Sequence, residues 1–198
     1  MCIRDRLSDE NLIMPYLDPN SENATVKALH RALKKYKLSA ALIRRAYRAG
    51  LERMQSFHSL IVEEGRRILA DAEREDRQVI VLAGRPYHAD PEINHGISKL
   101  LNSLGLSVVS EDAVFEDGNF VRVNVLNQWT YHARLYRAAE FVTRRKNVNL
   151  VQLVSFGCGI DAITTDEVRA ILESRGRLYT QIKIDEINNL GVVKIRLR

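Results

Sequence analysis

The chain has 198 residues, of which 45% are hydrophobic and 28% are charged, and its formal net charge is +5. This length suits one domain plus an appendage, and the composition is that of a globular protein, which excludes a disordered tail. No apolar run approaches the roughly 20 residues that cross a bilayer, and no signal peptide opens the chain. We therefore expect a cytoplasmic protein without a membrane partner.

The positive charge is dispersed over predicted helices and mixed with acidic residues. The basic groups are Lys34-Lys35, Arg44-Arg45, Arg66-Arg67 and Arg144-Arg145-Lys146. No recognition module accompanies them, and dispersed charge is typical of a solvated surface, so no nucleic-acid partner is expected.

The first 76 residues predict an irregular segment followed by helices. Residues 1–23 carry loop residues, and the opening Met1 to Arg6 is similar to adapter-derived starts of metagenomic gene predictions, so it carries no structural argument. Residues 24–76 have helical periodicity, with one helix over 25–35 and a long one from Ser39, a suitable N-cap. Its apolar or small stripe, which packs on its own protein or binds a partner, is Ile43, Tyr47, Gly50, Met54, Phe57, Ile61, Gly65 and Ile68.

From residue 77 to 198 the pattern alternates between strand and helix. The predicted strands cover residues 79–83, 106–110, 150–155 and 178–184. Helices are predicted from Asp90-Pro91 to about 104, over 123–145, and from a capping box of Thr164 and Glu167 to about 174. The tail from residue 185 fits either a loop plus helix or another strand. We expect an α/β fold, a Rossmann-like parallel sheet of about four strands with flanking helices, preceded by the long helical segment.

Unusual residues follow three of these strands, at the ends where such sheets bind ligands. Residues 83–90 follow the first strand, residues 155–161 the third, and Asp185-Glu186 the fourth. We therefore expect three loops to converge on one rim.

The first loop contains Gly84, Arg85, Tyr87 and His88. Amide donors before a helix, with a guanidinium beside them, favour an anion. Equally, Arg85 and His88 could hold the loop by internal hydrogen bonds. The loop matches neither a P-loop nor the dinucleotide fingerprint, so both interpretations stay open.

The second loop places Cys158 between Gly157 and Gly159, with Asp161 following. An accessible backbone and a helix dipole favour the thiolate, which is the form that binds soft metals and iron–sulfur clusters. A buried cysteine without a role, or a catalytic thiol with His88 or His95 as its base, are the alternatives. The only other cysteine is Cys2, so no disulfide framework is possible.

The remaining histidines suggest no site. His30 and His58 lie on predicted helices as ordinary partly buried residues. Trp129 to His132 falls within a predicted helix, where core packing is favoured over a ligand stack.

Four stretches resemble a known family. They are VIVLAGRPYHADPEINHGI (79–97), LNQWTYHARLYRAAEFV (126–142), LVQLVSFGCGIDAITTDEVRAIL (150–172) and LYTQIKIDEINNLGVVKIRLR (178–198). They are similar to the C-terminal part of the large CoA-substrate-specific enzyme activases related to 2-hydroxyacyl-CoA dehydratases, the 2-hydroxyglutaryl-CoA dehydratase activator family. The resemblance covers about residues 24–198.

This resemblance implies a function. Family members combine an ATP-hydrolysing activase with Rossmann domains that bind a [4Fe-4S] or related cluster, and ATP hydrolysis drives an electron to low potential. Cys158 would be one cluster ligand, with Gly157, Gly159 and Asp161 as its supporting loop. Gly84, Arg85, Tyr87 and His88 would form the site rim.

The chain lacks the ATP-binding activase domain and the upstream cluster cysteines of that family. The resemblance therefore implies a fragment, inactive alone, whose partners are the activase and upstream dehydratase-like domains, with an acyl-CoA as the possible substrate. The alternatives are a structural or docking domain of the same large protein, and an anion- or nucleotide-binding module.

Overall fold

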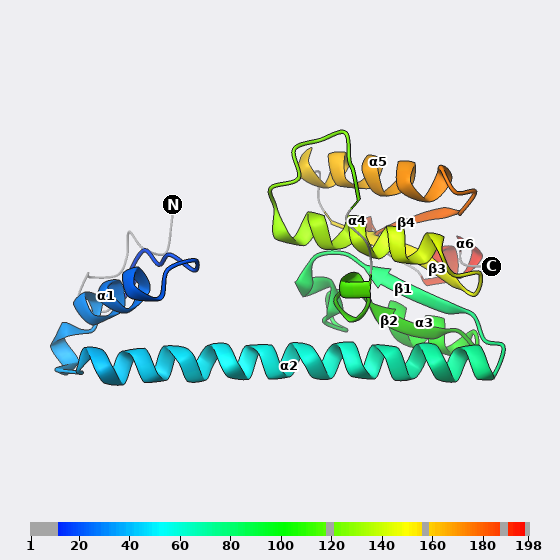
Figure 1. The fold of residues 1–198 in the computed structure, drawn as a ribbon. Coiled ribbons are helices and arrows are strands. Elements are labelled where there is room, and N and C mark those ends of the chain that lie inside the picture. The colour runs from blue at the N-terminus through cyan, green and yellow to red at the C-terminus, as the bar shows by residue number, and fades with distance from the viewer. Residues whose placement is uncertain (1–11, 118–120, 156–158, 187–189, 197–198) are drawn as a thin grey trace. The chain divides into compact units, whose positions relative to one another are not determined.

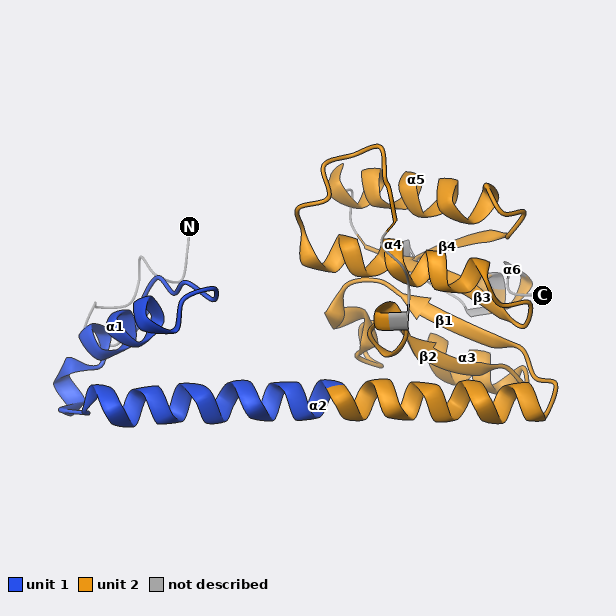
Figure 2. Cartoon of the chain, viewed as in Figure 1, with its two compact units in different colours: residues 1–58 blue, residues 59–198 orange. Residues whose placement is uncertain are grey.

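A computed structural model describes residues 12–117, 121–155, 159–186 and 190–196 of the chain. The chain forms two compact units, residues 1–58 and 59–198, which Figure 2 colours separately. The boundary falls inside helix α2 (Ala40–Arg74). Each unit is described by itself.

The first unit contains helix α1 (Glu22–Ala32) and the start of α2. Ser21 caps α1, and the Ser39 hydroxyl accepts a hydrogen bond from the Leu42 amide at 3.1 Å, which confirms Ser39 as the cap of α2. The Glu22 carboxylate lies 2.7 Å from the Arg44 guanidinium and 2.9 Å from that of Arg48. These ion pairs tie α1 to the first turns of α2.

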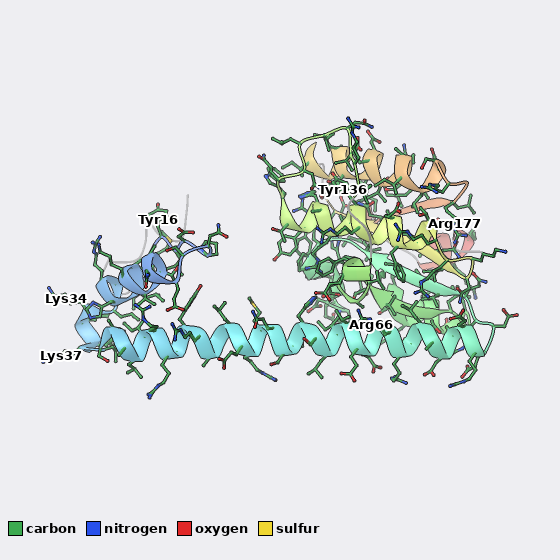
Figure 3. The ribbon with its side chains drawn as sticks, in the orientation of Figure 1. Tyr16, Lys34, Lys37, Arg66, Tyr136 and Arg177 are labelled. Carbon is green, nitrogen blue, oxygen red and sulfur yellow. The ribbon has the colours of Figure 1, made fainter. Side chains whose placement is uncertain are left out.

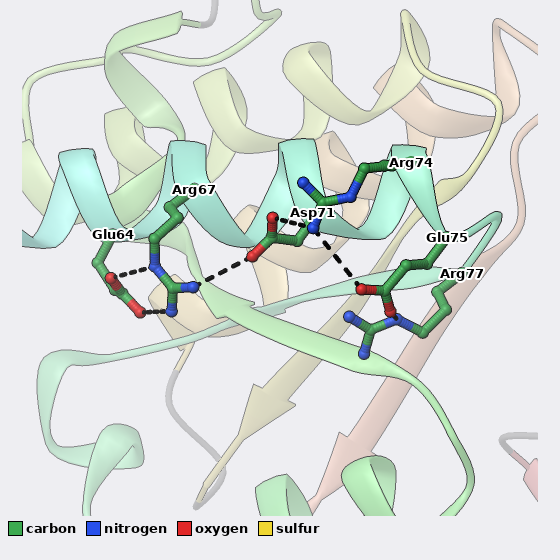
Figure 4. Close-up of polar contacts among 6 residues, drawn as sticks. All are labelled: Glu64, Arg67, Asp71, Arg74, Glu75 and Arg77. Atoms are coloured by element: carbon green, nitrogen blue, oxygen red, sulfur yellow. Dashed lines mark hydrogen bonds and ion pairs between the residues drawn. The ribbon is translucent and has the colours of Figure 1, made fainter.

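In the second unit, the last turns of α2 pack on the α/β core. Leu69 and Ala72 are buried there, and Ile61 and Ile68 pack beside them. Gly65 lies so close to Ala113 that a Cβ at residue 65 would be 2.6 Å from the Ala113 Cβ. The exposed face of α2 carries a row of ion pairs at helical spacing, which Figure 4 shows. Its residues are Glu64, Arg67, Asp71 and Arg74.

The sheet is parallel throughout, with the strand order β2-β1-β3-β4 (Figure 1). Its strands are β1 (Val79–Ala83), β2 (Ser107–Ser110), β3 (Val148–Val154) and β4 (Tyr179–Lys183). The predicted α/β class with four parallel strands is therefore confirmed. The chain passes from β1 to β2 on one side of β1, and then returns to place β3 and β4 on the other side. The direction in which strands are added therefore reverses between β1 and β3.

Helices cover both faces of the sheet. They are α3 (Ile97–Ser103), α4 (Thr130–Thr143), α5 (Gly159–Glu173) and α6 (Leu190–Arg196). One core cluster joins α2, α4 and α5 to alternate residues of β1 such as Val79 and Val81. The other joins α3 and α6 to the residues between them, Ile80 and Leu82. This alternation is why β1 is apolar along its whole length.

The helix predicted after Asp90 starts later than expected. Asp90 does accept hydrogen bonds from the amides of Glu92 and Ile93, but α3 begins only at Ile97. His95 and Gly96 have φ angles of 53° and 73°, and the Asn94 side chain accepts from the Gly96 amide. Over residues 90–96, hydrogen bonds from backbone amides to the Asp90 and Asn94 side chains therefore stand in place of some of the backbone hydrogen bonds of a helix.

Two other helix starts were also wrong. Helix α4 begins at Thr130 and not near residue 123, because the alternating Val121, Val123 and Val125 pack on the core in a segment without regular secondary structure. Helix α5 begins at Gly159, so Thr164 lies inside it and donates to the Ile160 carbonyl instead of capping.

The ambiguous tail forms a 3-10 turn over Ile184–Glu186 and then α6. Gly105 has a φ of 80°, which confirms it as the left-handed stop after α3. Within the described ranges, no helix is both long and apolar enough to span a membrane.

Candidate functional site

The loop after β1 is built around a close contact between Gly84 and His88. A Cβ on residue 84 would lie 2.4 Å from the His88 Nδ1 atom and 3.2 Å from the Leu153 carbonyl oxygen. The first distance is shorter than real Cβ atoms show and the second is tighter than most Cβ contacts, so a residue larger than glycine would have to displace the His88 ring. The 3-10 turn Pro86–Ala89 brings the His88 ring back over the end of the strand.

The hydrogen bonds of His88 determine its tautomer. The Arg85 amide donates to Nδ1 at 3.0 Å, so Nδ1 carries a lone pair and the proton is on Nε2. Nε2 lies 3.2 Å from the Ser155 hydroxyl and therefore donates to it. The side chain is 3% exposed, and this burial lowers the pKa of His88, which keeps the ring neutral.

Ser155 joins the end of β3 to this loop. Its hydroxyl is also 3.0 Å from the hydroxyl of Tyr87, whose ring lies edge-on to His88 with centroids 4.5 Å apart. Because neither nitrogen of His88 offers a lone pair to the Ser155 proton, the two residues are not arranged as a nucleophile and its base. The network instead holds the β1 and β3 ends together.

A second link crosses the same edge. The Arg85 guanidinium donates from Nε and Nη2 to one oxygen of Asp161, at 3.0 and 2.6 Å. The two side chains are 24% and 13% exposed, so the pair is only partly screened by water. It ties the loop after β1 to the first turn of α5.

The side chain of Asn94, which sequence reasoning missed, also stabilises the loop after β1. Its side-chain amide donates to the His88 carbonyl at 3.0 Å, and the residue is 1% exposed. No sequence signal identified it, because an asparagine between isoleucine and histidine is equally typical of an exposed turn.

A depression of about 300 Å³ lies where three loops meet. Its lining residues come from the β1 loop (Tyr87, Ile93, His95), the end of β3 (Ser155) and the residues after β4 (Ile184, Asp185). The expected convergence of three loops is therefore confirmed for the described residues.

A second cavity of about 210 Å³ lies on the β2 side of the loop, and sequence reasoning missed the charged residues in its lining. The Arg134 guanidinium of α4 lies 2.9 Å from a Glu111 oxygen and 3.5 Å from an Asp112 oxygen. Burial raises the pKa of Glu111 from its ordinary 4.5 to about 7, and Arg134 opposes that effect. Arg85 also lines this cavity.

The predicted ligand loop is only partly described. Gly157 and Cys158 lie outside the described residues. Gly159 is the first residue of α5, and a Cβ added to it would meet no described atom within 4 Å. The structure brings Gly84, Arg85, Tyr87, His88 and Asp161 together at one edge. Their assignment to a cofactor stays a prediction.

The described residues alone form no metal centre. Among them, no three histidine, cysteine, aspartate or glutamate side chains converge as metal ligands would. The described polar groups at the depression are oxygens and ring nitrogens, and a soft iron–sulfur cluster prefers thiolates. Neither cysteine of the chain, Cys2 or Cys158, lies among the described residues, so a cluster at this edge stays a prediction.

Comparisons with known proteins identify the family. No curated protein and no solved structure matches the chain. One protein-family model, described as a CoA enzyme activase uncharacterised domain, matches residues 1–114, which is more than half of the chain. That range includes the opening residues that we set aside and the whole loop after β1. The chain therefore belongs to the family of the CoA enzyme activase uncharacterised domain.

Proposed function

We propose that this chain is the scaffold of one cluster-ligand cysteine in an iron–sulfur protein related to 2-hydroxyacyl-CoA dehydratases and their ATP-dependent activase. Cys158 is the ligand in this proposal. Gly157, Gly159 and Asp161 form its supporting loop, and residues 84–88 form the adjoining rim. The family match supports the activase relationship, and the proposal adds the cluster to it.

The observation that carries the proposal is how firmly the flanks of residues 156–158 are tied to the β1 loop. On one side, Ser155 bonds to Tyr87 and His88, and on the other, Asp161 bonds to Arg85. Both flanks lie at the point where the strand order reverses, which is where open α/β sheets bind ligands. Rigid flanks are what a metal-ligating loop requires, because supporting contacts orient the ligand.

The cluster supplies one-electron transfer at low potential when it is bound. The residues of this chain have other tasks. The neutral side chains of His88 and Ser155 fix the β1 loop by hydrogen bonds without adding charge. The Arg85–Asp161 ion pair lies beside them, and its two charges cancel. ATP binds only to the activase domain, which reaches this chain as a partner together with dehydratase-like domains, and an acyl-CoA is the substrate.

Anaerobic production of the chain together with its activase and dehydratase-like domains tests this proposal by iron and acid-labile sulfide analysis. Cys158→Ala is expected to lower the iron content, whereas Cys2→Ala, the matched control on the only other cysteine of the chain, is not. An unchanged iron content in Cys158→Ala would refute the ligand assignment and favour the docking-domain alternative.

The anion- or nucleotide-binding alternative has less support. Two guanidinium groups line the cavity beside the β1 loop, but Arg85 is paired with Asp161, and Arg134 with Glu111. An anion would have to displace these carboxylates, which removes most of the attraction that isolated arginines provide.

A further inference from the structure

One buried histidine in the second unit has no hydrogen-bonding role in the described structure. His132, in the first turn of α4, is only 6% exposed. Among the described residues, neither its Nδ1 nor its Nε2 atom has a hydrogen-bond partner. Buried polar groups are almost always satisfied in folded proteins, so an imidazole left in this state points to a partner that is not part of the described chain.

His132 lines a cavity of about 210 Å³. The cavity lies between α4, the first turns of α5 and residues 125–128. Its walls include the side chains of Trp129, Tyr136, Ile160, Ile163 and Thr164. Trp129 packs against His132 with ring centroids 5.1 Å apart, and Tyr136 is labelled on α4 in Figure 3. The cavity thus has mainly apolar and aromatic walls, with the polar Asn127 and Gln128 also in its lining, and His132 is its buried polar side chain without a partner among the described residues.

The charge state of His132 restricts what can bind. Burial lowers the pKa of this imidazole, which stays neutral and offers one N–H donor and one lone pair. The other buried polar groups are already used: the Thr164 hydroxyl donates to the Ile160 carbonyl at 2.8 Å. The charged groups that act on His132 are Arg85 and Asp161, and they are paired with each other at 2.6 Å. An ionised ligand would therefore have to displace one of them to gain a counter-charge.

We infer that this cavity is a binding site for a small uncharged molecule that has an apolar ring and a hydroxyl or amide group, with His132 as its hydrogen-bond partner. The ring packs between Trp129 and Ile163, and the polar group bonds to the imidazole. A cavity of about 150 Å³ is known to hold benzene, so about 210 Å³ accommodates a single substituted ring.

Trp129 makes the inference directly measurable, because it is the only tryptophan of the chain and lines the cavity. Cyclohexanol, which does not absorb where tryptophan is excited, is titrated into the full chain while Trp129 fluorescence is recorded. A saturable change is expected. Cyclohexanecarboxylate, an ionised molecule of similar shape, is expected to bind more weakly.

Variants then identify the contact. His132→Phe retains the ring and is expected to weaken cyclohexanol binding about 3- to 10-fold, which corresponds to one hydrogen bond, without weakening methylcyclohexane binding. His132→Gln keeps a donor and an acceptor and is expected to retain part of the alcohol affinity. His30→Phe, the same exchange at an exposed position, is the matched control.

Ile163→Phe at the half-exposed mouth is expected to block the cavity, and it provides a test if His132→Phe does not fold. The inference is refuted if cyclohexanol produces no saturable change, if His132→Phe or Ile163→Phe binds it as the wild type does, or if the carboxylate binds more tightly. None of these readings depends on iron content, so they are independent of the cluster proposal.

Discussion

Replacing Gly84 with alanine is expected to destabilise the α/β unit strongly, because the new methyl group meets the buried His88 ring. The added Cβ would be 2.4 Å from Nδ1 of that ring and 3.2 Å from the Leu153 backbone oxygen. The ring cannot move outward freely, since hydrogen bonds to the Arg85 amide and the Ser155 hydroxyl hold it on both sides.

The magnitude follows from what has to give way. Forcing an extra methyl group into a packed site costs about 1–3 kcal/mol. Displacing His88 would also break one or both of its hydrogen bonds, at about 1 kcal/mol each. The expected loss is about 2–5 kcal/mol, a large share of the about 5–15 kcal/mol that keeps a typical domain folded.

Urea unfolding monitored by circular dichroism measures this free energy. Gly50→Ala is the matched control, because nothing lies within 4 Å of its added Cβ and an alanine in a helix interior is expected to stabilise by about 0.5–1 kcal/mol. In the His88→Ala background the cost of Gly84→Ala is expected to fall below about 1 kcal/mol. An unfolding midpoint for Gly84→Ala equal to that of the wild type would refute the geometry.

Two further predictions concern pH. The pKa of His88 is lowered, so its stabilising contribution is complete above pH 6.5 and is lost as the pH falls. In the His88→Asn variant, the free energy of unfolding should therefore decrease less steeply as the pH is lowered. An unchanged slope of that free energy against pH would contradict this prediction. The pKa of Glu111 is raised from 4.5 to about 7, so the stability that it contributes is present below 4.5 and is lost as the pH rises through 7. The Glu111→Gln variant should not lose stability as the pH rises through 7. If its free energy of unfolding depends on pH as that of the wild type does, then burial of Glu111 does not cause the loss.

The two central strands, β1 and β3, were predictable because each is a mainly apolar run between turn residues. Val79 to Ala83 forms a buried central strand, as its uniform apolarity indicated. The caps at Ser39 and the stop at Gly105 were also predictable, since each depends on neighbouring backbone groups alone.

The starts of the helices were less predictable, because tertiary contacts decided them. Residues 121–125 form an irregular segment whose valines at 121, 123 and 125 pack on the core, although a helix was expected from residue 123. Thr164 and Glu167 form a plausible capping box by spacing, yet Glu167 accepts from the distant Asn124 amide instead. A hydrogen-bond donor that is distant in the sequence, such as the Asn124 amide, cannot be identified from the few residues around the predicted cap.

The candidate site shows the same division. Residues 84–88 and Asp161 were chosen from their place after strands, and the structure brings them to one edge. That Arg85 is held by Asp161, and that Glu111 faces Arg134, depends on pairs separated by 76 and 23 residues. His132 was expected to be core packing, and its buried side chain without a described partner emerged only from the tertiary structure.

The sequence by itself determined the alternation of strands and helices and the edge at which polar residues gather, because periodicity and turn chemistry act over a few residues. Only the tertiary structure decided which side chains meet there. Ion pairs, tautomers and cavities depend on groups that are distant in the chain and are brought together by packing, which shifts their protonation and fixes their partners.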